Sequence, residues 1–454
     1  MQKNINMTQG KPMKLLFSFA LPLMFGNIFQ QLYTVTDTAI VGRGVGMHAL
    51  AALGSSDWLC WLLLGIAFGY SQGFSVRIAQ KFGEQNWAEL KKYVAQSALL
   101  AGAISLVCLV IGQAGMDFFL FMLRVPAELR PMAELYTRII FGGIVATMFY
   151  NYCAATLRAI GNSKTPLIAM IVASVTNIIL DLVAVYVLHW GIGGAAAATV
   201  LAQFIAGVIC CIKMCRTQEL KFSKNDLKID LAILKNLLFL GTPVAAKNLV
   251  ICIGGMMITA IVNGFSVSFI SGFTAANKLF GLLEIAAVSY GYAVTTYVGQ
   301  NYGAQKIDRI KAGIVDAVKL SIGTSLMIGA IVIALGRFIV KLFISSEDIT
   351  MMLEAENIGY SFLFVMAVFL PFLYLLYVYL SALQGMGDSV TPMISGFIEL
   401  GIRVGVSLIV GYLGIQKGIF GAEVGAWVGA SVFLIFQYRK FMKRVLPNAA
   451  QNAT

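Results

Sequence analysis

The chain has 454 residues, of which 59% are hydrophobic and only 12% are charged, and its mean hydropathy is +0.83. This composition excludes an ordinary soluble domain, in which roughly a quarter of the residues are charged. A formal net charge of +12 would suit a nucleic-acid-binding protein, but the basic residues are distributed as in a membrane protein, so we expect no nucleic-acid partner.

Apolar stretches near or above the roughly 20 residues that cross a bilayer recur along the whole chain. They predict helices, because the strands of a membrane barrel are about half as long and alternate in polarity. Residues 1–14 are polar and carry lysines, and no cleavable signal peptide is expected. The twelve predicted spans are residues 15–42, 49–79, 93–115, 132–157, 166–189, 191–215, 234–262, 269–299, 313–336, 354–384, 392–412 and 418–438.

Lysine and arginine are far more frequent in one set of predicted loops than in the other. By the positive-inside rule, this asymmetry places both termini and the polar segment 216–233 in the cytoplasm. We therefore expect a multi-pass protein of the bacterial inner membrane, surrounded by lipid and monomeric. The seven cysteines lie within predicted spans or at a cytoplasmic helix end, where disulfides are not expected.

The two halves of the sequence repeat the same motifs in the same order. The segment LRAIGNSKTP at 157–166 returns as LQGMGDSVTP at 383–392. Further pairs are FGEQ at 82–85 with YGAQ at 302–305, Pro22 with Pro243, Asn27 with Asn248, and GIGGA at 191–195 with GIFGA at 418–422. Six spans per half is an even number, so the halves are parallel repeats that form two pseudo-twofold six-helix bundles.

The predicted organisation is an N-terminal six-helix lobe at 1–215, a cytoplasmic linker at 216–233 and a C-terminal six-helix lobe at 234–454. Two such lobes typically enclose a cleft with alternating access, which indicates a transporter. An integral membrane enzyme would need clustered His, Ser or carboxylate chemistry, and the sequence offers no such cluster. A flippase of lipid-linked oligosaccharides is the alternative transporter, although its cleft should carry more Arg and Lys.

Three motifs resemble the multidrug and toxic compound extrusion family, in particular its bacterial small multidrug exporters. They are FALPLMFGNIFQQLYTVTDTAIVGRGVGMHALAALG at 19–54, the paired G-[ND]-S-x-T-P loops, and the paired F/Y-G-x-Q loops. The resemblance covers the chain from end to end. It implies a secondary active antiporter, without a cofactor, that exports amphipathic and often cationic small molecules in exchange for Na⁺ or H⁺.

Two acids in the first half are candidates for binding the coupling ion, because carboxylates inside the bilayer are costly and mark ion paths. Asn177 and Asp181 are one helical turn apart, as are Ala195 and Thr199 on the next span. The short turn between these spans puts Asp181 and Thr199 at the same depth, and Asp37 lies at a comparable level. With the backbone carbonyl of Ala195 as a further candidate ligand, this all-oxygen set suits a hard cation such as Na⁺. The matching positions form the cation site of the N-terminal lobe in the family.

The second half lacks this set of oxygen ligands. At the equivalent positions it carries Ile258, Arg403, Ser407 and Ala426, in the order of Asp37, Asn177, Asp181 and Thr199. We therefore expect only the first half to bind the coupling ion.

Other polar residues in the spans are candidates for contacting the substrate. They are Gln30, Gln31, Tyr33, Lys247, Lys278 and Glu284. Lys247 and Glu284 are equally far from the turn between their spans and could face each other, whereas Lys278 has no assigned partner. Either lysine could serve an acidic or zwitterionic substrate. Glu399 and Arg403, one turn apart, are predicted to form a structural ion pair.

Overall fold

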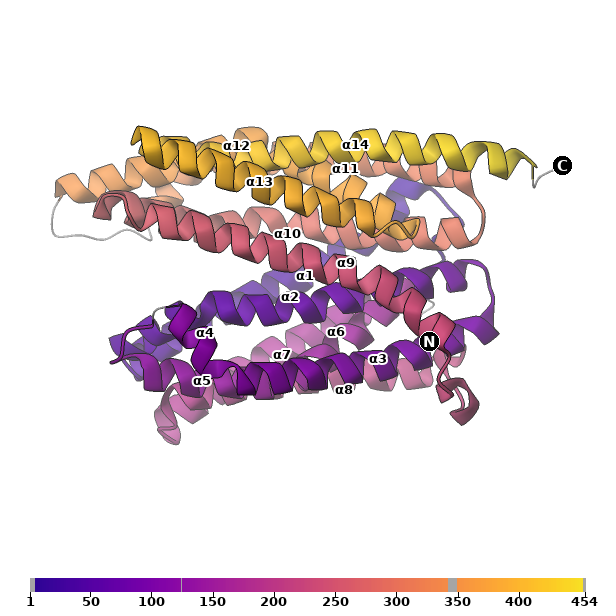
Figure 1. The fold of residues 1–454 in the computed structure, drawn as a ribbon, viewed down its shortest axis with the longest axis horizontal. Helices are drawn as coiled ribbons and strands as arrows, with labels where there is room; N and C mark the ends of the chain where they lie inside the picture. Colours follow the sequence, from indigo (N-terminus) through magenta and orange to yellow (C-terminus); the bar gives the residue numbers. More distant parts are fainter. Residues whose placement is uncertain (1–4, 124, 342–348, 452–454) are drawn as a thin grey trace. The chain divides into compact units, whose positions relative to one another are not determined.

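The structure is a computed structural model that describes residues 5–123, 125–341 and 349–451. Over these ranges the regular structure is entirely helical (Figure 1). Eleven helices are long and apolar enough to cross a membrane, or twelve if the bent pair α5 and α6 forms one span. The predicted all-α integral membrane fold is confirmed.

The first half of the chain contains most of the shorter helices. Its elements are α1 (Pro12–Gly44), α2 (Met47–Gly83), α3 (Trp87–Ala114), α4 (Met116–Met122), α5 (Arg130–Gly142), α6 (Ile144–Ala159), α7 (Lys164–Leu182), η1 (Val183–Val187) and α8 (Gly191–Arg216). Two short turns of helix follow in the predicted linker, η2 (Gln218–Leu220) and η3 (Lys224–Leu227).

The second half consists mainly of long helices. They are α9 (Leu231–Val262), α10 (Val267–Gly303), α11 (Ile307–Lys341), α12 (Ile349–Gly385), α13 (Val390–Leu413), η4 (Gln416–Ile419) and α14 (Phe420–Gln451). Most extend beyond the predicted apolar stretches, because a helix continues past the bilayer wherever its end is solvated and capped.

The predicted span at 132–157 is not one straight helix. It breaks at Gly143 into α5 and α6, which meet at a bend of 44°. A Cβ atom on Gly143 would lie 2.2 Å from Cγ2 of Val200 on α8, so the close approach of α8 requires glycine at the bend.

Contacts divide the chain into two compact units. The described residues of Met1–Met7 and Leu21–Leu249 form the first unit, and those of Thr8–Ala20 and Val250–Thr454 form the second. The units follow spatial contacts, whereas the predicted lobes follow the sequence repeat. The first part of α9 therefore belongs to the first unit, where Asn236 Oδ1 accepts a 2.7 Å hydrogen bond from Arg77 Nε.

The repeated turns adopt the same local geometry in both halves. Gly161 and Gly387 have φ values of +86° and +93°, in the left-handed region that glycine tolerates best. In each turn a side-chain oxygen accepts a 3.0 Å bond from a backbone N–H three residues later, Asn162 from Thr165 and Asp388 from Thr391. The repeated G-[ND]-S-x-T-P motif thus specifies one turn twice.

The linker is bound to the first unit. Gln96 on α3 donates from Nε2 to the carbonyl oxygens of Asp226 and Lys228, at 3.0 and 2.7 Å. Its Oε1 accepts from the Asp230 N–H at 3.3 Å. Because Gln96 is 1% exposed, these bonds are shielded from water and fix the second part of the linker against α3.

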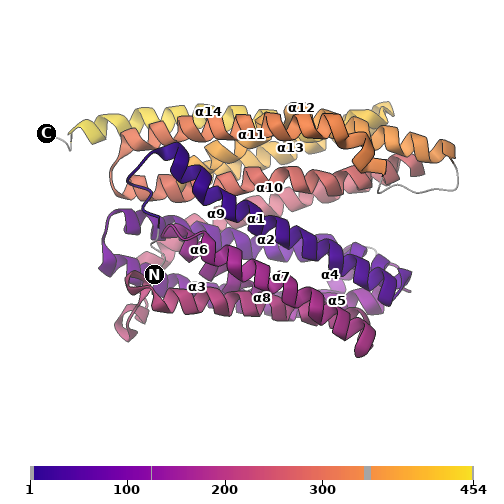
Figure 2. The ribbon, with the colours of Figure 1, turned by 180° about the vertical axis from the view of Figure 1, so that it is seen from behind.

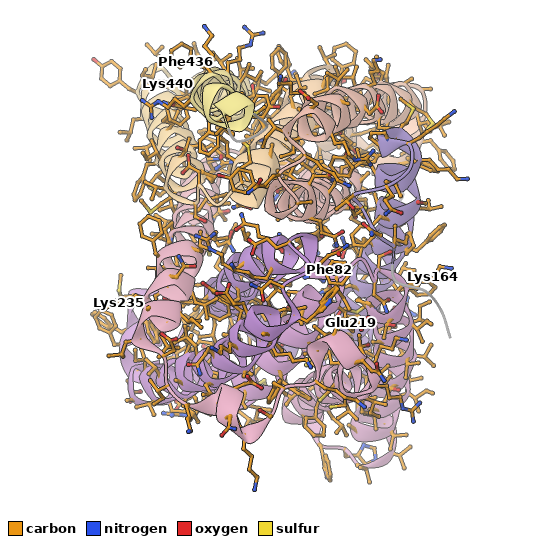
Figure 3. The ribbon with its side chains drawn as sticks, turned by 90° about the vertical axis from the view of Figure 1, so that its right-hand side faces the viewer. Phe82, Lys164, Glu219, Lys235, Phe436 and Lys440 are labelled. Atoms are coloured by element: carbon orange, nitrogen blue, oxygen red, sulfur yellow. The ribbon has the colours of Figure 1, made fainter. Side chains whose placement is uncertain are left out.

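Three connections of the first unit lie at one end of its helices. Figure 3 looks onto that end and shows Phe82 at the end of α2, Lys164 at the start of α7 and Glu219 of the linker. This arrangement follows from helices that run alternately up and down.

Candidate cation site

The predicted cation ligands lie on three neighbouring helices of the first unit. Figure 2 shows α1 beside α7 and α7 beside α8. Ser174 on α7 donates a 3.2 Å hydrogen bond through Oγ to the Phe29 carbonyl on α1. This bond holds α7 against α1. Asp37 is 6% exposed, whereas Asn177 and Asp181 are completely buried.

The carboxyl groups of Asp37 and Asp181 are close enough to interact directly. Among the described residues, no N–H or O–H group bonds to Asp37 Oδ1, to Asn177 Oδ1 or to either carboxylate oxygen of Asp181. Buried acceptors without donors are costly, and two adjacent carboxylates cannot both remain charged in a dry site. This arrangement therefore requires a proton or a bound cation.

Thr199 on α8 completes the predicted set. Its Oγ1 accepts a 3.4 Å hydrogen bond from Nδ2 of Asn177, so the amide oxygen of Asn177 takes no part in that bond. Ala195, one turn earlier on α8, is completely buried. We refer to Asp37, Asn177, Asp181 and Thr199 as the acidic site.

Gln203 is a member of this neighbourhood that sequence reasoning missed. It is one turn beyond Thr199 on α8, and its Nε2 lies 3.3 Å from the Tyr33 hydroxyl on α1. Tyr33 also interacts with the Gln30 side chain. The spacing of Ala195, Thr199 and Gln203 by four residues is a signal that could have identified Gln203.

The other predicted substrate residues are dispersed over the chain. Gln31 is partly exposed on α1, Lys247 is buried on α9, and Lys278 is exposed on α10. Glu284 accepts a 2.5 Å hydrogen bond from the Tyr377 hydroxyl of α12. Lys247 belongs to the first unit and Glu284 to the second, so their pairing stays a prediction.

The second unit contains a buried arginine with two glutamates. The predicted pair of Arg403 and Glu399 is confirmed, with Nη1 and Oε2 3.6 Å apart. Glu423 on α14, which the sequence analysis did not include, is closer. Arg403 donates to it from Nε at 3.2 Å and from Nη2 at 2.9 Å. The ion pair therefore connects α13 to α14 as well as successive turns of α13.

Comparison with known proteins identifies relatives of the whole chain. The sequence profile described as MatE matches the chain twice, at residues 22–183 and 243–409. The chain is 28% identical to the probable multidrug resistance protein YpnP of Bacillus subtilis (strain 168), over 97% of this chain and 98% of that protein. It is 25% identical to the probable multidrug resistance protein NorM of Thermotoga maritima, over 93% and 90%.

A crystal structure of MATE in complex with MaL6 matches the fold with a TM-score of 0.91 at 22% identity. The match covers 98% of this chain and 100% of that one. The two separate matches of one family profile agree with the duplication read from the sequence.

Proposed function

Since the chain belongs to the MatE family, the multidrug and toxic compound extrusion transporters, which are not enzymes, we propose that it is a secondary active antiporter. It exports amphipathic, often cationic small molecules in exchange for Na⁺ or H⁺. The names of its relatives support export of drug-like compounds, because YpnP and NorM are both described as probable multidrug resistance proteins.

One observation carries the proposed ion coupling: the four buried oxygen atoms of Asp37, Asn177 and Asp181 that receive no hydrogen bond. Such a set is stable only when a proton is shared between the carboxylates or a cation is bound among the oxygens. Oxygen ligands without nitrogen or sulfur suit a hard cation, of which Na⁺ is the candidate here.

Coupling follows if the cation and the substrate favour different packings of α1, α7 and α8. A cation entering the acidic site neutralises the two carboxylates and stabilises the packing that brings them together. A substrate that binds the other packing more tightly lowers the affinity for the cation, so entry of one favours exit of the other. The direction of net transport is then set by the ion gradient.

The excess of basic residues in one set of loops supports a plasma-membrane protein with both termini in the cytoplasm. With this orientation, the linker and the turn before α7 face the cytoplasm. The chain carries a complete acidic site within one unit, which supports function as a monomer.

The test uses purified protein in sealed vesicles, with a fluorescent amphipathic cation as the transported probe. A Na⁺ gradient and a pH gradient are imposed in separate experiments, each with the membrane potential clamped. We expect one gradient or both to drive accumulation of the probe. Asp37→Asn should lower the driven component by roughly tenfold or more while leaving equilibrium binding of the probe measurable.

Driven transport by Asp37→Asn at the wild-type rate would overturn the assignment of the acidic site. Absence of transport by the wild-type protein under both gradients would overturn antiport itself. If the wild-type protein binds the probe but neither gradient drives its transport, the protein recognises the substrate without being driven by that ion.

A further inference from the structure

The buried ion group of the second unit occupies the repeat-equivalent place of the acidic site. Arg403 stands where the first half has Asn177, and Ser407 stands where it has Asp181. Arg403, Glu399 and Glu423 come from α13 and α14, the repeats of α7 and α8. We refer to Glu399, Arg403, Ser407 and Glu423 as the arginine site.

The two sites carry their carboxylates at different repeat positions, and each carboxylate of one half corresponds to an uncharged residue in the other. Counted by the repeat, Glu399 and Glu423 correspond to the buried alanines Ala173 and Ala196 of the first half. Conversely, the acids of the first half are replaced by Ile258 and Ser407. Each half therefore carries two carboxylates at this level, of which Glu423 is partly exposed, but only the second half carries a cation of its own.

We infer that Arg403 is a built-in cation that permanently occupies the second half's version of the cation site. Its guanidinium is held as a bound ion would be, by carboxylates on two helices. It is 7% exposed, with both oxygens of Glu423 within 3.2 Å of Nε and Oε2 of Glu399 3.6 Å from Nη1. A guanidinium keeps its proton at every physiological pH, so this cation can be neither exchanged nor deprotonated.

The packing around Arg403 is adapted to the length of its side chain. A Cβ atom on Gly254 of α9 would lie 3.2 Å from Cδ of Arg403, so a larger residue there would press on the arginine stem. Ser407, one turn further along α13, is buried and its Oγ has no hydrogen-bond partner, and neither has Nη1 of Arg403. A cavity that loses the guanidinium would therefore present two carboxylates and a free hydroxyl to a small cation.

This inference rests on the proposed cation site of the first half, and it adds a reason for the single coupling site. A repeat with its cation covalently attached stays in the loaded arrangement, so only the first half can respond to an ion gradient. Arg403 would then be a positioning residue for α13 and α14, and would not contact the substrate.

The test removes the Arg403 side chain by substitution and then supplies a small cation from solution in its place. Arg403→Ala should lower the melting temperature of the purified protein by about 3–6 °C, because it removes the ion-pair partner that Glu399 and Glu423 share. Guanidinium chloride at millimolar, non-denaturing concentration should restore a large part of that loss, and NaCl a smaller part. Tetramethylammonium chloride, a cation with no hydrogen-bond donors, should restore none.

Arg337→Ala is the matched control, since Arg337 is an exposed arginine of the same unit that lies over the Tyr360 ring. Guanidinium should not raise the melting temperature of Arg337→Ala or of the wild-type protein. A second readout is binding of radioactive Na⁺ in an Asp37→Asn background, in which Arg403→Ala should create a site that the single variant lacks.

Equal effects of guanidinium and tetramethylammonium on Arg403→Ala would overturn the inference, and so would an unchanged melting temperature. If Arg403→Ala does not fold, Arg403→Lys and Arg403→Met decide the matter. A tethered cation predicts that lysine preserves more stability than methionine, whereas a packing role predicts the reverse. These melting experiments do not depend on coupling, so failure of the proposed antiport would leave their outcome unaffected.

Discussion

Asp37 on α1 and Asp181 on α7 bring their carboxyl groups together inside the first unit, although 143 residues lie between them in the sequence. Within the described part of the chain, the pair has no basic partner of the kind that Arg403 gives to Glu423 in the second unit. Its charge balance is therefore left to a proton or an ion from solution.

Asp37→Asn and Asp181→Asn should each reduce gradient-driven export by roughly tenfold or more, because coupling between two ligands typically contributes 1–3 kcal/mol. Folding should survive, since removing one buried charge from a like-charged pair relieves repulsion. Initial rates of probe transport and melting temperatures are measured on the same preparations.

Ser407→Ala is the control for those two variants, because it alters the repeat-equivalent position in the second half. It should leave the driven rate within about twofold of wild type. A Ser407→Ala protein as defective as Asp181→Asn would show that both halves take part in coupling.

Thr199→Val should weaken the apparent affinity for the driving cation by roughly fivefold, the equivalent of about 1 kcal/mol for one oxygen ligand. The measurement is the dependence of transport rate on cation concentration. Thr137→Val is a control, because Thr137 is buried in the first unit and its hydroxyl bonds within its own helix, to the Ala133 carbonyl. Equal shifts in both variants would exclude a specific role for Thr199.

Glu284→Gln and Tyr377→Phe should be strongly non-additive. Their direct hydrogen bond predicts a coupling energy of about 1.5–3 kcal/mol in a double-mutant cycle on unfolding. Tyr374→Phe provides the comparison, since the Tyr374 hydroxyl bonds to the Leu283 carbonyl instead. Its effect should add to that of Glu284→Gln, and additivity in both cycles would argue against the assigned bond.

Gly161→Ala should destabilise the protein by about 1 kcal/mol or more, because its backbone is left-handed and a Cβ atom would collide with the Ile5 carbonyl oxygen. Gly102→Ala is the control: Gly102 is helical, and a Cβ there meets nothing within 4 Å. That substitution should stabilise by roughly 0.5–1 kcal/mol. Thermal melting compares them, and equal effects would contradict this account of the turn.

The linker cap at Ser223 and Asp226 should depend on pH in one direction. Hydrogen bonds from the Ser223 N–H and hydroxyl to Oδ2, at 2.7 and 2.8 Å, hold the pKa of Asp226 below its ordinary value. A lowered folded-state pKa means that the cap is fully formed above the ordinary value of about 3.9 and is lost as the pH falls through the lowered one. Hydrogen exchange across 218–228, corrected for intrinsic rates, should therefore stay constant from neutral pH to about 5.

Asp226→Asn should raise exchange in that segment at neutral pH, because the amide lacks the charge that strengthens both bonds. A wild-type transition well above pH 5 would contradict the assigned hydrogen bonds.

Sequence reasoning located the span containing Asp37 and the two spans containing Asp181 and Thr199, because a fixed rise per residue converts spacing into depth. The four-residue spacing from Thr199 indicates the helix face of Gln203 but not its partner, since a glutamine in a span bonds equally well to any neighbouring helix. The helix that carries the hydrogen-bond partner of Gln203 becomes known only from the packing of α1 against α8.

Glu423 was missed for a different reason. It lies near the start of the last predicted span, where a charged residue is usually solvated, and only the packing of α13 on α14 brings it to Arg403. The bend at Gly143 was missed because hydropathy measures the length of an apolar stretch and not its direction. In each case the missing information concerns which faces of two helices meet.

The chain passes from one compact unit to the other three times, once in the turn at Met7 and Thr8 and twice within continuous helices. The helical crossings fall between Ala20 and Leu21 of α1 and between Leu249 and Val250 of α9. A helix resists torsion and stretching far more than a coil does, so these two helical segments are stiff connections. Each contains a proline, Pro22 or Pro243, which removes one backbone hydrogen bond and lowers the bending stiffness there. Because the linker at 216–233 lies within the first unit, lengthening it would not loosen the connection between the units. Replacing Pro22 and Pro243 would restore the missing backbone hydrogen bonds and stiffen the two helical connections.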